Sequence, residues 1–144
     1  MKNSGFMFSV FGRENFTNLL QEKQTMSKKE FGNLLAVMYN AKTDNAPVEL
    51  LLQCFEGLKK WHLMDINELL VYWKMPQHIT IYRGAFMTEK QPRLSWSLEE
   101  SIARMYGEGK MFKTTICKKD IIAYFKNEKE VVALVEQGYE TYYT

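Results

Sequence analysis

The sequence predicts an α+β protein: an N-terminal helical bundle packed on a small antiparallel β-sheet. Two observations lead to this prediction. Up to about Pro76, apolar residues recur at the three- and four-residue spacing of an amphipathic helix. After Pro76, apolar and polar residues alternate as they do in strands. We therefore expect a helical part over residues 1–75 and a β-rich core over residues 76–144, either as two parts or within one compact domain.

Four helices are expected in the first half. The second begins at Ser27, where Glu30 completes a capping box. Asn45 can cap the third helix, with Pro47 in its first turn, and Asp65 caps a short fourth helix. In chain order, the apolar residues expected to be buried are Phe16, Leu19 and Leu20; Phe31, Leu34, Leu35 and Met38; Val48, Leu51, Leu52, Phe55 and Leu58; and Ile66, Leu69, Leu70 and Trp73.

The second half is expected to contain strands over residues 78–83, 111–117 and 130–135. Two short helices are expected between them. One begins at Ser97, with Glu100 three residues later and Leu98, Ile102 and Met105 on its apolar side, and the other covers residues 120–125. The aromatic tail at 138–143 can pair as an edge strand.

Composition narrows the classes of function. The chain has 19 Lys and Arg against 17 Asp and Glu, a net charge of +2, and its basic pairs are scattered, so a nucleic-acid partner is not expected. Cys54 and Cys117 have no local spacing motif, and His62 and His78 have no ligands at metal-binding spacing, so we expect a reducing compartment and no metal. No signal peptide or membrane-crossing apolar run is recognised, so a cytoplasmic protein without membrane association is expected.

Arg83 is the first candidate functional residue. It ends a strand on the same side as Ile79 and Ile81, where a buried guanidinium needs an anionic partner such as a phosphate. The alternative is a strand-end arginine that reaches solvent or pairs with a structural carboxylate.

Ser95 is the second candidate. Ser97 is explained as a helix cap, which leaves Ser95 to hold another side chain, unless the segment is an ordinary strand-to-helix turn.

Glu128 and Glu130 are the remaining candidates. If the strand begins near Glu128, both carboxylates share one face with Val132 and Leu134, and their Cα atoms are about 6.5–7 Å apart. A glutamate that enters a buried face is rarely structural unless it is paired. The alternative is a solvated, charged turn over residues 126–130. For Glu128, both interpretations remain open: a carboxylate on the buried strand face and a solvated residue of the turn.

In chain order, three short segments resemble the ADP-ribosyltransferase superfamily. They are Ile-Thr-Ile-Tyr-Arg-Gly at 79–84, Leu-Ser-Trp-Ser-Leu at 94–98 and Glu-Lys-Glu-Val-Val at 128–132. The superfamily carries an arginine, a serine and a glutamate in this order, and small members are found in bacteria and their phages. The resemblance covers roughly residues 76–135. It implies a split antiparallel sheet of the ADP-ribosyltransferase type.

The resemblance also implies roles for individual residues. Arg83, followed by Gly84, would hold a phosphate of NAD, and Ser95 would orient Glu130. Gly84 and Ser97 would lie with Arg83 and Ser95 in the NAD-binding elements. Glu130 would bind the ribose hydroxyl next to the scissile nicotinamide bond.

The implied reaction is transfer of ADP-ribose from NAD, a consumed substrate, to a protein arginine. Glu128 would accept the proton of the acceptor, and the helical half would be the surface that docks the target. Three alternatives remain: a catalytically inactive, partner-binding inhibitor of the kind a phage encodes, an NAD glycohydrolase, and a helical regulator whose C-terminal motifs are coincidental.

Overall fold

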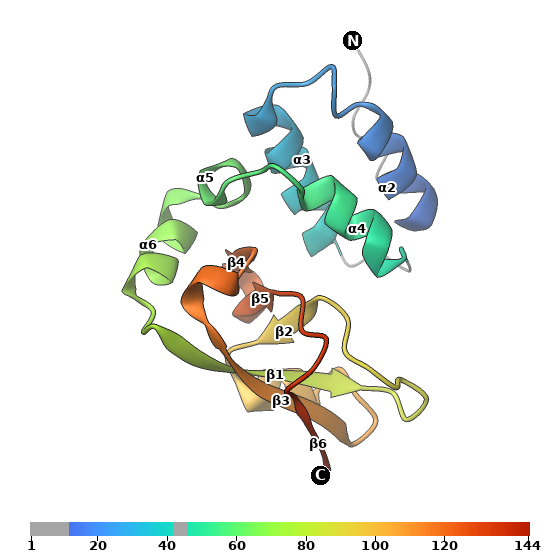
Figure 1. Cartoon of the computed structure of the whole chain (residues 1–144), viewed down its shortest axis with the longest axis vertical. Helices are drawn as coiled ribbons and strands as arrows, with labels where there is room; N and C mark the ends of the chain where they lie inside the picture. The colour runs from blue at the N-terminus through green and yellow to red at the C-terminus, as the bar shows by residue number, and fades with distance from the viewer. Residues whose placement is uncertain (1–11, 42–45) are drawn as a thin grey trace. The chain divides into compact units, whose positions relative to one another are not determined.

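The computed structural model describes residues 12–41 and 46–144, and the fold is α+β, as predicted (Figure 1). The described helices are α2 (Gly12–Gln21), α3 (Lys28–Asn40), α4 (Val48–Phe55), α5 (Lys60–Leu63), α6 (Ile66–Lys74) and α7 (Glu100–Arg104). The strands are β1 (His78–Ala85), β2 (Ser95–Ser97), β3 (Lys110–Cys117), β4 (Ala123–Phe125), β5 (Glu130–Val132) and β6 (Glu140–Tyr143). Two 3₁₀ turns, η1 (Lys118–Asp120) and η2 (Lys126–Glu128), flank β4.

The chain divides into two compact units, Met1–Met64 and Asp65–Thr144. We expected the helical part to extend to residue 75. The contacts instead assign α6 to the unit that contains the sheet, because α6 packs against β4.

The first unit contains the helices α2 to α5. The predicted capping box of α3 is confirmed: the Glu30 backbone N–H donates to the Ser27 hydroxyl at 3.1 Å, and the Ser27 N–H donates to the Glu30 carboxylate at 3.2 Å. Gly32 allows close contact with α5, because a Cβ on Gly32 would lie 2.3 Å from the His62 carbonyl oxygen. The buried side chains of α2 to α4 are Phe16, Leu19, Phe31, Leu35, Ala36, Met38, Tyr39, Leu51, Cys54 and Phe55.

The beginning of α4 differs from the prediction. Pro47 occupies the N-cap position rather than the first turn, and it makes no side-chain cap. Asn45, the predicted cap, lies outside the described residues.

The C-terminal end of α4 is held by Lys23, whose ammonium donates to the carbonyl oxygens of Gln53 at 2.7 Å and Glu56 at 2.6 Å. A cation at the carbonyl end of a helix is favourable because it satisfies unpaired acceptors.

The predicted cap of α6 is confirmed, but the predicted buried side of the helix is wrong. The Asp65 carboxylate accepts from the Glu68 N–H at 2.8 Å. Of the expected stripe only Leu69 is buried, and Ile66, Leu70 and Trp73 are exposed. Glu68 is buried instead, and its carboxylate accepts a hydrogen bond from the Lys126 N–H of η2 at 3.0 Å. A polar contact therefore replaces part of the expected apolar packing of α6.

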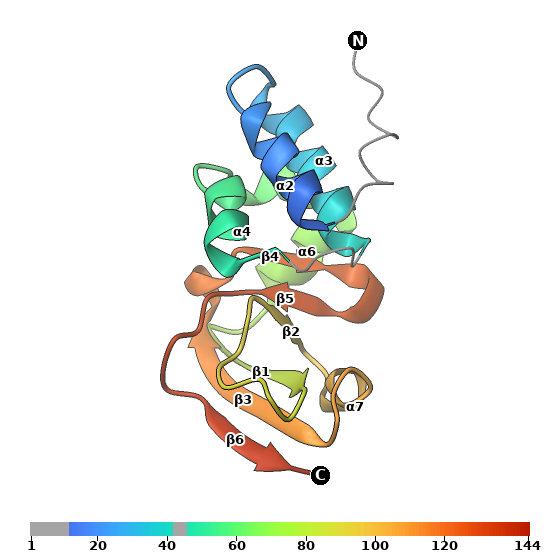
Figure 2. The same ribbon diagram turned by 90° about the vertical axis from the view of Figure 1, so that its right-hand side faces the viewer.

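The strands form one antiparallel sheet in the order β4-β5-β2-β1-β3-β6, which Figure 2 shows. The strands predicted at 78–83 and 111–117 are confirmed as β1 and β3, paired from His78–Cys117 to Ala85–Lys110. The predicted edge strand in the tail is confirmed as β6, which pairs with β3.

Two predictions about the second half are wrong, and a third, the strand over 130–135, holds only for its first three residues. Residues 120–125 form the end of η1 and the strand β4 rather than a helix. Ser97 does not begin a helix: it is the last residue of β2, α7 begins at Glu100, and Met105 beyond the end of α7 is exposed. The strand expected over 130–135 ends at Val132.

The middle of the sheet is narrow. One pair of residues, Tyr82 and Ser97, registers β1 with β2. The sheet therefore consists of two three-stranded ladders, β4-β5-β2 and β1-β3-β6, joined at a single position, rather than two separate sheets. No helix in the described part of the chain is both long and apolar enough to cross a bilayer.

Candidate active site

A row of side chains crosses the middle of the sheet. Tyr82 on β1 is paired with Ser97 on β2, Ser97 with Glu130 on β5, and Glu130 with Phe125 on β4. Directly paired residues of antiparallel strands point to the same face, and their Cα atoms are about 4.5–5.5 Å apart. Tyr82, Ser97 and Glu130 therefore stand side by side on one face, across the narrow join of the sheet.

Glu130 is buried, with 4% of its surface exposed. The residue before it, Lys129, has a left-handed backbone with φ of 49°, and its ammonium donates to the Glu99 carboxylate at 2.5 Å. This pairing with Glu99 raises the pKa of Lys129. The turn thus directs Lys129 outward and begins β5 with the carboxylate of Glu130 inward, as the alternation toward Val132 predicted.

Glu128 does not share the strand with Glu130. It lies in η2, and the left-handed residue between the two breaks the alternation on which the expected common face depended. The half-buried Glu128 accepts a hydrogen bond from the hydroxyl of Tyr106, which follows α7. Glu128 is therefore held next to Glu130 by a turn and by a tyrosine that the sequence did not identify.

Ser97, rather than Ser95, is the serine opposite Glu130. Ser95 is paired with Val132. The Ser97 hydroxyl accepts from the Glu99 N–H at 3.1 Å and donates to the Glu128 carbonyl oxygen at 3.3 Å, so it connects β2 to η2. The alternation of residues along the strand placed both serines on one face. Which of the two lies opposite Glu130 is decided by the register between β2 and β5.

Arg83 is bound on two sides. Its Nε donates to the Glu89 carboxylate at 2.7 Å, and its Nη1 donates to the Ser95 carbonyl oxygen at 2.9 Å. The side chains of Arg83 and Glu89 are only 16% and 14% exposed. The anionic partner expected for Arg83 is thus a carboxylate of the same chain. This is the alternative in which Arg83 pairs with a structural carboxylate rather than with a phosphate. No sequence pattern singled out Glu89, because it lies in the irregular segment between β1 and β2.

Lys110 fixes the segment that carries Glu89. The Lys110 ammonium donates to the Glu89 carbonyl oxygen at 2.5 Å and to that of Met87 at 3.4 Å. The Glu108 carboxylate accepts the Met87 N–H at 2.9 Å. The backbone of the loop is therefore held by side chains at and just before the start of β3, in addition to the Arg83–Glu89 pair that attaches the loop to β1.

The three residues expected to converge were Arg83, Ser95 and Glu130. Ser95 is paired with Val132, so it shares a face with Glu130 but lies two positions away along the strands, and Ser97 is the residue paired with Glu130. Arg83 follows Tyr82 along β1, so strand alternation directs it to the face opposite Tyr82 and Glu130. Ile81 lies on the same face as Arg83, as does Phe112, with which Arg83 is paired. Arg83 contacts β2 through the main chain of Ser95, next to the narrow join.

Gly84 has a packing role. A Cβ on Gly84 would lie 2.0 Å from the Ala103 carbonyl oxygen, and a Cβ on Gly107 would lie 2.5 Å from the Ala85 nitrogen. Only glycine permits this approach of α7 and its following turn to β1. The glycine after Arg83 is thus explained by helix packing, independently of the predicted contact with NAD.

Comparisons with known proteins add no family to this geometry. No family model matches the chain, and neither curated proteins nor solved structures match it.

Proposed function

We propose that the protein transfers ADP-ribose from NAD to an arginine of a protein acceptor, with Glu130 as the central catalytic residue. The observation that carries the proposal is the buried Glu130 carboxylate, paired across the strands with Ser97. A buried carboxylate in this position provides a fixed negative charge in a region of low dielectric. Such a charge stabilises a cation that forms beside it.

The reaction develops such a cation. When the bond between the ribose C1′ and the nicotinamide nitrogen breaks, its electron pair leaves with nicotinamide, and positive charge forms on the ribose. The acceptor nitrogen then bonds to C1′ and loses a proton. Glu128 lies in η2 and accepts a hydrogen bond from the Tyr106 hydroxyl. It is the proposed base for this proton.

The role of Arg83 requires an exchange of partners. In the proposed complex a phosphate oxygen of NAD replaces the Glu89 carboxylate on the guanidinium Nε. A guanidinium group binds carboxylates and phosphates alike. Strand alternation directs Arg83 and Glu130 to opposite faces of the sheet, so contact of one dinucleotide with both residues also requires a local change at the join of β1 and β2.

A second candidate is a partner-binding protein that performs no chemistry on NAD. It is favoured by the Arg83–Glu89 ion pair and by the packing of Gly84 on α7, because each gives a motif residue a purely structural reason.

Incubation of the full chain with labelled NAD and a cell lysate distinguishes the two candidates. Transfer predicts label on a discrete protein with the wild type and none with Glu130→Gln. The matched control is Glu140→Gln, which changes an exposed carboxylate on β6 and should label as the wild type does. Labelling that is unaffected by Glu130→Gln, or none with the wild type, would reject the proposal. Nicotinamide release without protein labelling would indicate a glycohydrolase.

A further inference from the structure

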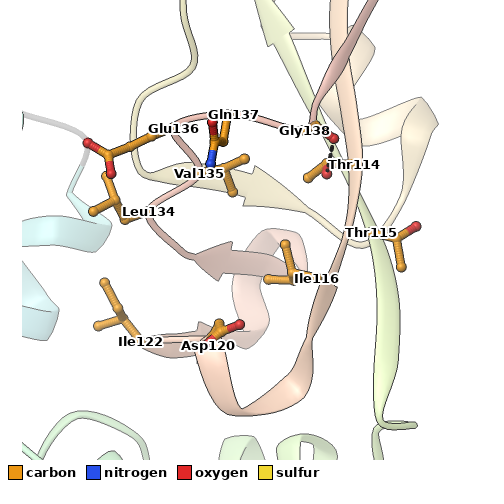
Figure 3. A pocket seen from close by; sticks show the side chains of 10 residues that line it. All are labelled: Thr114, Thr115, Ile116, Asp120, Ile122, Leu134, Val135, Glu136, Gln137 and Gly138. Carbon is orange, nitrogen blue, oxygen red and sulfur yellow. Dashed lines mark hydrogen bonds between the residues drawn. The ribbon is translucent and has the colours of Figure 1, made fainter.

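A pocket of about 480 Å³ lies between β3 and the segment that connects β5 to β6 (Figure 3). Its volume is in the range of ligand-binding sites. The aliphatic part of the lining consists of Ile116, Ile122, Leu134 and Val135. The row of Tyr82, Ser97 and Glu130 contributes nothing to this lining, so the pocket is separate from the proposed catalytic row.

Two carboxylates flank this aliphatic lining. Asp120, at the end of η1, and Glu136, in the segment after β5, lie apart from each other around the pocket, as Figure 3 shows. Both residues are exposed, and within the described part of the chain neither side chain takes part in a hydrogen bond or an ion pair. The nearby Lys118 does not neutralise Asp120, because its ammonium donates to the carbonyl oxygens of Trp73 and Met75.

The same pocket borders an edge of the sheet that no strand covers. β6 pairs only with Lys110–Lys113 of β3, whereas β1 pairs with β3 along its whole length. Beyond Lys113, the Thr114 hydroxyl donates to the Gly138 carbonyl oxygen at 3.0 Å, and the chain turns away from β3. Among the described strands none covers the outer edge of residues 114–117, where backbone N–H and C=O groups can pair with an added strand.

We propose that this pocket binds an extended, basic segment of the acceptor protein, which adds as a strand beside residues 114–117. The segment's backbone continues the line of β6 along β3. The aliphatic stem of an arginine or lysine lies on Ile116 and Val135, and its cationic head reaches Asp120 or Glu136. The assignment of the partner as the acceptor rests on the proposed transferase function, whereas the binding of a basic segment does not.

Binding of a fluorescent peptide, Val-Arg-Val-Arg-Val, to the full chain tests the proposal, with Val-Glu-Val-Glu-Val and arginine amide as comparison ligands. The variant Asp120→Asn/Glu136→Gln removes both charges at exposed positions, where folding should be retained. The control Glu49→Gln/Glu56→Gln removes the same charge from exposed positions at α4, outside the pocket and away from β6. Nicotinamide release from NAD is measured on the same preparations.

The expected result is binding of the basic peptide by the wild type and the control. The pocket variant should bind about tenfold more weakly, equivalent to about 1.4 kcal/mol. Its nicotinamide release should be unchanged. Equal binding by the pocket variant, no binding by the wild type, or equally tight binding of arginine amide would overturn the proposal. If the wild type binds the peptide but releases no nicotinamide, the pocket is a binding site for a basic segment, and the proposal that this segment belongs to an acceptor of ADP-ribose is rejected.

Discussion

The ion pair between Arg83 and Glu89 gives the sharpest prediction for NAD binding. If the Glu89 carboxylate occupies the place of a phosphate, removing its charge should strengthen binding of NAD. Glu89→Gln keeps a neutral oxygen that can accept from Arg83 Nε, at 2.7 Å in the wild type. The Lys110 contacts that hold the loop involve main-chain oxygens, so the substitution leaves them intact.

The size of the effect follows from the kind of hydrogen bond that is lost. A bond to a charged partner contributes about 1.5–3 kcal/mol and a neutral one about 1 kcal/mol, so the exchange releases about 0.5–2 kcal/mol. Both side chains are mostly buried, at 16% and 14% exposure, so solvent screens this difference little. The dissociation constant for NAD should therefore fall about tenfold. The free energy of unfolding without NAD should fall by about 0.5–2 kcal/mol, because the guanidinium keeps a hydrogen bond but loses its counter-charge.

Isothermal titration with NAD and urea unfolding measure the two quantities on the same variant. Arg83→Lys is the matched comparison, because it keeps the charge but loses the fork geometry that binds a phosphate. Its affinity for NAD should fall. An unchanged or weaker affinity in Glu89→Gln, together with the expected loss of stability, would show that the pair is structural and that Arg83 does not bind the dinucleotide.

Three further predictions concern other parts of the second unit. Gly84→Ala should lower the free energy of unfolding by about 2–4 kcal/mol in urea titrations, because its Cβ would lie 2.0 Å from a carbonyl oxygen of α7; a loss below about 0.5 kcal/mol would contradict this packing. The hydrogen bond to Lys126 lowers the pKa of Asp65 below its ordinary 3.8, so its stabilising contribution is present above this pH and disappears as the pH falls through the lowered value. Asp65→Asn should therefore be less stable than the wild type at neutral pH, and the two should converge in acid-unfolding curves below about pH 4; parallel curves would argue against the pairing. Glu128→Gln should reduce transfer to protein more than nicotinamide release, and equal losses would remove Glu128 from its role as base for the acceptor.

Periodicity predicted the elements that have one clearly buried side. The alternation in β1 and β3, the capping box of α3 and the Asp65 cap of α6 were sufficient to locate these elements. The segment over 120–125 was assigned the wrong structure because a short, continuously apolar run fits a buried strand as well as a helix. The buried side of α6 was wrong because Glu68 takes a backbone partner from η2 that no local pattern records.

The candidate site was predictable as far as strand parity extends. Parity with Val132 and Leu134 predicted that Glu130 points inward. Glu130 is buried, but so is Val131 of the opposite parity, and Leu134 is exposed, so β5 is covered on both faces and parity alone does not account for the burial. Whether Ser95 or Ser97 lies opposite Glu130 depends on the register between β2 and β5, which is a long-range property. Glu89 escaped notice because an irregular loop has no periodic signal that relates it to Arg83.

The most direct test of the central claim is the rate at which purified protein releases nicotinamide from NAD, compared between the wild type and Glu130→Gln. A carboxylate that stabilises the ribosyl cation predicts measurable release by the wild type and a loss of about 10²–10⁴-fold in the variant. Unfolding curves on the same samples should show that the variant remains folded. Equal rates in the two proteins, or no release by the wild type, would contradict the account.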